Sequence, residues 1–126
     1  HPSVFYDFFA TIADIVDSPL PYPTDGISYL PTLIGEKQIK HDYLYWEFPE
    51  KQYKGQQAIR TDNWKGIKKN LLKGKSKLQL FNLEDDPKEM NDLAENYPKI
   101  VDKLENLMEK AHTKAALEKF NIPILD

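Results

Sequence analysis

Residues 80–94 read LFNLEDDPKEMNDLA and join a strand to a helical region through an acidic turn. We expect the strand to run from Leu78 to Asn82. Asp86 and Pro87 then end it, because proline has no amide hydrogen to donate and restricts the residue before it. The acids in this turn are more typical of helix capping and solvation than of a metal site. The stretch therefore marks the passage from a sheet to a helical layer.

Three more strands are expected upstream of this turn. Residues 43–48 alternate their side chains with the two-residue period of a pleated sheet. Residues 57–61 and 64–68 form a hairpin about Asp62 and Asn63, which tolerate the positive φ of a tight turn. We expect the four strands to form one antiparallel sheet.

Two helices complete the expected elements. An apolar stripe predicts a helix from Pro98 to Thr113 that covers one face of the sheet. Apolar residues spaced three and four apart between Val4 and Val16 predict an N-terminal helix, with Ser3 placed to cap it. Residues 114–126 should form a partly ordered arm. The fold class is therefore α+β, with a four-stranded antiparallel sheet, a long C-terminal helix packed on it, and a separate N-terminal helix.

Charge is unevenly distributed along the 126 residues, although the net charge is only −3. Between Lys51 and Lys77 there are nine basic residues and one acid, Asp62. From Asn82 onward there are eleven acids and six bases. A basic middle could attract sulfates or phosphates over long range, but lysines on hairpins are more often solvated or protect edge strands. The overall negative charge and the absence of a recognised binding motif argue against nucleic acid as a partner.

The chain contains no cysteine, which excludes disulfides and thiol chemistry but does not identify a compartment. No run approaches the roughly 20 apolar residues of a membrane helix, so we expect no membrane partner. The compartment therefore stays unknown, and a periplasmic or secreted parent protein is compatible with the sequence.

Four motifs occur in an order that resembles the C-terminal portion of a sulfatase, in the alkaline phosphatase superfamily. They are DGISYLP at 25–31, HDYLYWEF at 41–48, AIRTDNWK at 58–65 and the closing stretch at 80–94. The resemblance extends from the DFFAT helix at residues 7–11 to Leu93. One departure is Ala10, where the family usually has proline, and it affects no chemistry.

The resemblance also shows what this chain lacks. Sulfatases use a cysteine or serine, followed by x-Pro-x-Arg, that matures to formylglycine and attacks sulfur beside a calcium ion. The only arginine here is Arg60, and neither Ser3 nor Ser18 begins the motif. We therefore expect no catalytic residue, metal ligand or cofactor in this chain, with calcium and formylglycine belonging to the parent enzyme.

The resemblance implies two parts. Residues 1–35 would be the tail end of the α/β catalytic domain, a helix and loop, and residues 36–126 the C-terminal sulfatase subdomain. The chain would complete the substrate cleft and brace the missing catalytic domain, and it would be inactive alone. A sulfated substrate, most simply a glycan, is the implied ligand of the parent.

Three residues are candidates for substrate binding because the first strand would border the cleft. Trp46 and Glu47 are the better candidates, although Trp46 could equally be a core residue. His41, at the start of the strand, could reach the rim or could be a surface residue.

Two other functions stay open on sequence grounds. The chain could belong to a related phosphodiesterase or phosphonate hydrolase, which shares the architecture and the closing motif. It could also be a stand-alone module that binds anionic glycans through its basic middle. The apolar stripe of the N-terminal helix would be buried against the catalytic sheet of a full sulfatase. Without that partner the stripe would be exposed, which predicts self-association of this chain through the helix.

Overall fold

The structure is a computed structural model that describes residues 1–49, 54–74 and 76–126. The chain forms two compact units, residues 1–42 and residues 43–126. From the sequence we expected the division between residues 35 and 36. Segment 36–42 stays with the first unit because Gln38 Nε2 donates to the Ser28 carbonyl at 2.9 Å and His41 Nε2 lies 2.7 Å from Asp7 Oδ1.

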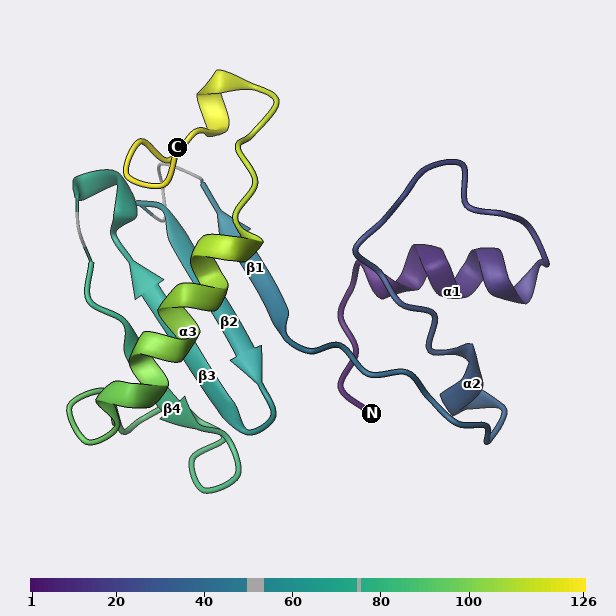
Figure 1. The fold of residues 1–126 in the computed structure, drawn as a ribbon, viewed down its shortest axis with the longest axis horizontal. Coiled ribbons are helices and arrows are strands. Elements are labelled where there is room, and N and C mark those ends of the chain that lie inside the picture. The colour runs from purple at the N-terminus through teal and green to yellow at the C-terminus, as the bar shows by residue number, and fades with distance from the viewer. Residues whose placement is uncertain (50–53, 75) are drawn as a thin grey trace. The chain divides into compact units, whose positions relative to one another are not determined.

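The second unit is built on one antiparallel sheet in the order β1-β2-β3-β4 (Figure 1). The strands are β1 Leu44–Phe48, β2 Gln56–Thr61, β3 Trp64–Lys69 and β4 Gln79–Asn82. All four confirm the expected strands to within one residue. Asp62 has a φ of 48°, as the tight turn between β2 and β3 requires.

The register assigns the side chains to two faces of the sheet. Tyr45 lies opposite Ile59, Ile59 opposite Gly66, and Gly66 opposite Leu80. Residues directly opposite one another share a face, and consecutive residues on a strand do not. Glu47 and Gln57 therefore lie on the face of Ile59, whereas Trp46 and Phe48 lie on the other face.

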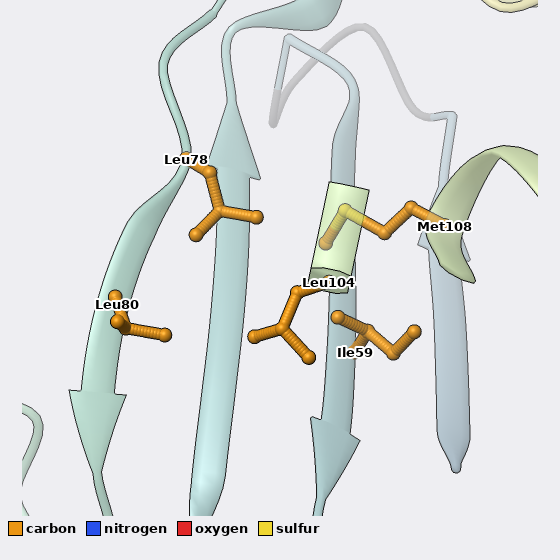
Figure 2. Packing of buried hydrophobic residues seen from close by; sticks show 5 residues of the cluster. All are labelled: Ile59, Leu78, Leu80, Leu104 and Met108. Atoms are coloured by element: carbon orange, nitrogen blue, oxygen red, sulfur yellow. The ribbon is translucent and has the colours of Figure 1, made fainter. Parts of the chain in front are cut away.

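Helix α3, Pro98–Ala111, covers the face that carries Ile59 (Figure 1). Figure 2 shows Leu104 and Met108 of α3 reaching between Leu78, Leu80 and Ile59, and all five side chains are buried. The helix ends two residues before the expected Thr113, because His112 has an extended backbone with ψ of 135°. The expected layer of one helix on one sheet is confirmed.

Gly66 is what allows α3 to approach the sheet so closely. A Cβ atom at this position would lie 2.9 Å from Leu78 Cδ1 and 3.1 Å from Leu104 Cδ1. Both distances are shorter than ordinary carbon contacts. A side chain at residue 66 would therefore displace the two leucines at the centre of the core.

Two short 3₁₀ helices, η2 Leu71–Lys73 and η3 Glu118–Phe120, complete this unit. The C-terminal segment, expected to be a partly ordered arm, is mostly exposed and is anchored at one residue. Ile122 is buried, and its amide donates to Asp126 Oδ2 at 2.8 Å.

The first unit contains α1, Asp7–Ile15, and α2, Leu30–Leu33. The expectation that Ser3 caps α1 is wrong, because Tyr6 holds the N-cap position and makes no side-chain cap bond. The Asp7 carboxylate instead accepts the Val4 amide at 2.9 Å. None of the helices in the described residues is long and apolar enough to cross a membrane.

Candidate functional site

Glu47 is the centre of a polar network on the α3 face of the sheet. Its Oε1 accepts the Tyr45 hydroxyl at 2.5 Å and Gln57 Nε2 at 3.1 Å. Gln57 Nε2 also donates to the Tyr45 hydroxyl oxygen at 2.6 Å. Two-residue spacing on β1 and the direct pairing of Glu47 with Gln57 bring these groups together.

His112 adds the end of α3 and the C-terminal segment to this network. Its Nδ1 lies 2.7 Å from Glu47 Oε1, and its Nε2 lies 3.3 Å from Asp126 Oδ1. The imidazole ring, which follows the last residue of α3, thus stands between two carboxylates.

The network changes the acidity of Tyr45. Burial raises the pKa of the Tyr45 hydroxyl well above its ordinary value, and the hydrogen bond to Glu47 raises it further. The phenol stays protonated and donates to Glu47. Tyr45 is therefore a structural donor and not a proton-transfer group.

A cavity of about 650 Å³ lies on the same side of the sheet, lined by residues of β2, β3, α3 and the C-terminal segment. Its lining includes three carboxylates, those of Asp102, Glu105 and Glu109. Lys68, which also lines it, is paired with Glu105 at 2.7 Å. An acidic lining repels sulfate, so this cavity is not a plausible sulfate site.

Trp46 lies on the face turned away from α3, and its side chain is 38% exposed. It stands opposite Ala58 on β2. Trp46 is thus only half-buried, and a wide aromatic surface stays available for contact. It does not belong to the core cluster under α3.

His41 lies in the first unit and is bound to Asp7, which has no exposed surface. Asp7 Oδ1 lies 2.7 Å from His41 Nε2 and accepts the Ile27 amide at 3.0 Å. Ile27 belongs to the DGISYLP motif, so the motif contributes directly to this contact. A Cβ atom at Gly26 would lie 2.3 Å from the Tyr6 carbonyl oxygen, so only glycine lets residue 27 approach.

The three residues predicted to bind substrate therefore do not form one cluster within either unit. Trp46 and Glu47 face opposite sides of the sheet, and His41 belongs to the other unit. Glu47 and His41 are both held by partners inside their own units. Trp46 is the most exposed of the three, at 38%.

The resemblance implies calcium and formylglycine in the parent enzyme. No group of three or more histidine, aspartate or glutamate side chains among them is arranged to hold a metal ion. The chain has no cysteine, and neither Ser28 nor Ser76 is followed by the proline and arginine that a maturing serine requires.

Sequence reasoning missed Asp7, His112 and Asp126. Asp7 and His41 are 34 residues apart, and Glu47 and His112 are 65 apart. Neither pairing follows a helical or strand period, so no local pattern indicates it. A useful signal for Asp7 is its position at the first turn of a helix, where a carboxylate is favoured.

The helix-covered antiparallel sheet has the α+β architecture expected for the C-terminal portion of a sulfatase. The family model "N-sulphoglucosamine sulphohydrolase, C-terminal" matches residues 4–114. The chain belongs to this family. The sulfatase resemblance and the α+β fold class are thereby confirmed.

Sulfatases are among the proteins to which the chain is similar. The chain is 28% identical over 121 residues to an N-acetylgalactosamine-6-O-sulfatase of Bacteroides thetaiotaomicron, covering 86% of this chain and 23% of the relative. It is 30% identical over 128 residues to human arylsulfatase K, covering 91% of this chain and 24% of that protein. The solved structure of a 2-O GAG sulfatase superposes with a TM-score of 0.71 at 29% identity, covering 82% of this chain and 23% of that one. This chain thus spans about a quarter of the length of these relatives.

Proposed function

We propose that this chain is the C-terminal part of an enzyme that hydrolyses sulfate esters on a glycan. In that enzyme it braces the catalytic domain and completes the substrate cleft, and alone it is inactive. The sulfatase names of the relatives support a sulfuric ester hydrolase. They do not favour a phosphodiesterase, a phosphonate hydrolase or a stand-alone glycan-binding module.

The observation that carries the bracing role is the exposed apolar face of α1. Phe5 and Phe8 are 91% and 52% exposed, and Phe9 and Ile12 are also exposed. They line a groove of about 550 Å³ together with Tyr22. An apolar surface of this kind marks a contact with another protein surface. We propose that residues 1–35 belong to the catalytic domain, and that this face packs against the rest of that domain.

The cleft role rests on β1. We propose that Trp46, Glu47 and His41 lie at the border of the cleft, with Trp46 contacting the sugar directly. Glu47 and His41 would hold their segments through the Tyr45–His112 network and the Asp7 carboxylate. The names of two relatives, an N-acetylgalactosamine-6-O-sulfatase and a 2-O GAG sulfatase, support a sulfated sugar as substrate. Calcium and formylglycine would be supplied by the parent outside this chain.

The bracing role is tested in the parent enzyme with Phe8→Glu and Phe9→Glu together. We expect loss of activity and a lower melting temperature, because two charges would be buried at the contact. Thr113→Glu with Ala116→Glu is the matched control, since both residues are exposed in the C-terminal segment. Full activity of the α1 variant would contradict the bracing role.

In the isolated chain we expect the same face to cause self-association, most simply as a two-fold dimer through α1. Burying one large apolar side chain is worth about 1.5 to 3 kcal/mol, and several are exposed here. Sedimentation velocity should show a concentration-dependent dimer that Phe5→Glu with Phe9→Glu abolishes. A chain that stays monomeric at high concentration would contradict this expectation.

For Trp46→Ala in the parent we expect a Michaelis constant raised several-fold and a nearly unchanged melting temperature. The indole is 38% exposed and lies outside the core cluster, so its removal should not leave a large cavity. Steady-state kinetics and thermal melting measure the two effects. A loss of about 3 to 5 kcal/mol of stability, with an unchanged Michaelis constant, would instead identify Trp46 as a core residue.

A further inference from the structure

Three lysines are brought together at one end of the sheet by backbone contacts. The amides of Leu71 and Leu72 donate to the carbonyls of Gly55 and Lys54 at 3.1 and 2.9 Å. These bonds hold η2 against the start of β2, where Gln56 pairs with Lys69 at the end of β3. Figure 1 shows η2, the start of β2 and the end of β3 at the same end of the sheet. Lys54, Lys69 and Lys73 are hereafter called the lysine end.

In the lysine end, η2 and the start of β2 lie very close together. Leu71 is buried under the turn. Gly55 has a φ of +71°, and a Cβ atom there would lie 3.1 Å from Leu72 Cγ. Asn70 has a φ of 62°, which turns the chain sharply between Lys69 and η2. The positions of the three lysine backbones are therefore fixed by packing and hydrogen bonds.

The charges of the lysine end are not neutralised by any residue that the structure describes. All three lysines are exposed, and none of their side chains forms a hydrogen bond or ion pair with a described residue. By contrast, Lys65 and Lys68 are paired with Glu89 and Glu105. Protection of a sheet edge does not account for the three lysines, because β1 and β4 are the edge strands and none of the three lies on them.

An aromatic surface adjoins these charges on the face away from α3. Phe48 stands opposite Gln56, and Gln56 opposite Lys69, so the three residues form one row across the sheet. Phe48 is 47% exposed, and Trp46 lies two residues along the same strand and face. Aromatic faces pack well against the C–H groups of sugar rings, while ammonium groups attract sulfate.

We propose that the lysine end and Phe48 form a secondary binding surface for the chain of a sulfated polysaccharide, next to the part of the substrate held at Trp46. This inference rests on the proposed function, since it places the surface beside the proposed cleft border. A sulfated chain carries repeated fixed negative charges and sugar faces, which match the lysines and the aromatic row. The acidic cavity on the opposite face discourages binding there.

Binding of this 126-residue chain to an end-labelled chondroitin sulfate oligosaccharide tests the proposal. The variant carries Lys54→Gln, Lys69→Gln and Lys73→Gln. The matched control carries Lys99→Gln, Lys103→Gln and Lys110→Gln, three exposed lysines of α3 with the same total change in charge. We expect the variant to weaken binding at least about tenfold at low salt, and to reduce the slope of log Kd against log salt by about 2 to 3. The control should bind like the unmodified chain.

Equal weakening in the variant and the control would overturn the proposal, because it would show attraction by total charge alone. Equal binding of unsulfated hyaluronan of the same length, or of a DNA strand of equal charge, would overturn the assignment to a sulfated glycan. Phe48→Ala should weaken binding with no change in the salt slope.

Kinetics of the parent enzyme separate this inference from the proposed function. The triple lysine variant should raise the Michaelis constant for a sulfated polysaccharide several-fold and leave that for a small aryl sulfate unchanged. An active parent whose kinetics on both substrates are unaltered would overturn the secondary surface alone. A parent with no sulfatase activity would overturn the proposed function, while the binding experiment on this chain would still stand.

Discussion

The isolated 126-residue chain is expected to release no sulfate from an aryl sulfate, with or without added calcium. Enzymes accelerate such reactions by about a million-fold or more, and the covalent route requires an activated nucleophile. The chain has no cysteine, and none of the serines Ser3, Ser18, Ser28 and Ser76 lies in the maturing motif. Neither Tyr45 nor Glu47 can substitute, because each is committed to the other in the network beneath α3.

The measurement is sulfate release followed by ion chromatography, with the full-length parent as the positive control. A second control is the parent with its motif cysteine or serine changed to alanine, which should be as inactive as the isolated chain. The opposite result would be that the isolated chain releases more sulfate than buffer does, in proportion to its concentration and after repurification. That result would contradict the proposal that the chain alone is inactive.

Leu104→Ala is expected to produce the largest loss of stability in the sheet-and-helix unit. Leu104 has no exposed surface, lies over Gly66, and stands between Leu80 and Ile59 in Figure 2. The substitution removes three carbon atoms at a place where the glycine offers no side chain to fill the space. A buried leucine changed to alanine costs about 2 to 5 kcal/mol, and the rigid surroundings favour the upper half of that range.

Thermal and urea unfolding measure this effect on the isolated chain. For a unit of this size each kcal/mol shifts the melting temperature by about 4 to 8 °C, so a fall of more than about 10 °C is expected. Leu107→Ala is the matched control, because Leu107 lies on the same helix but is only partly buried at the margin of the cluster. Leu107→Ala should lower the free energy of unfolding by about half as much as Leu104→Ala, or less. An equal loss of unfolding free energy in the two variants would contradict the central position of Leu104 in the core.

Most of the sheet could be predicted because its information is local. The signals that predict the strands each span only a few residues: the alternation along 43–48, the Asp62-Asn63 turn and the proline after β4. The observed strands agree with the expected ones to within one residue. The exact end of α3 could not be predicted in this way. His112 leaves the helix to reach Glu47, 65 residues away, and that distant contact overrides the helical propensity of the sequence.

The candidate site could be predicted only in part. The motif order correctly indicated the family, and period two correctly placed Glu47 with Tyr45 and away from Trp46. The partners of Glu47 and His41 come from α3 and from α1, and tertiary contacts of this kind leave no periodic trace in a single sequence. The cap assigned to Ser3 was wrong for a different, local reason: α1 begins only at Asp7, and the Asp7 carboxylate accepts the Val4 amide three residues before it.

The buried carboxylate of Asp7 has a consequence for how the first unit would meet its partner. Its two oxygens accept amides from residues 4 and 27 and lie beside the imidazole of residue 41, while Thr11 Oγ1 accepts the Tyr29 amide at 3.0 Å. Loop, helix and following segment are thus already ordered before any docking. Association of preorganised surfaces avoids most of the conformational entropy that coupled folding and binding must overcome. The first unit would therefore already be folded when it contacts the rest of the proposed catalytic domain.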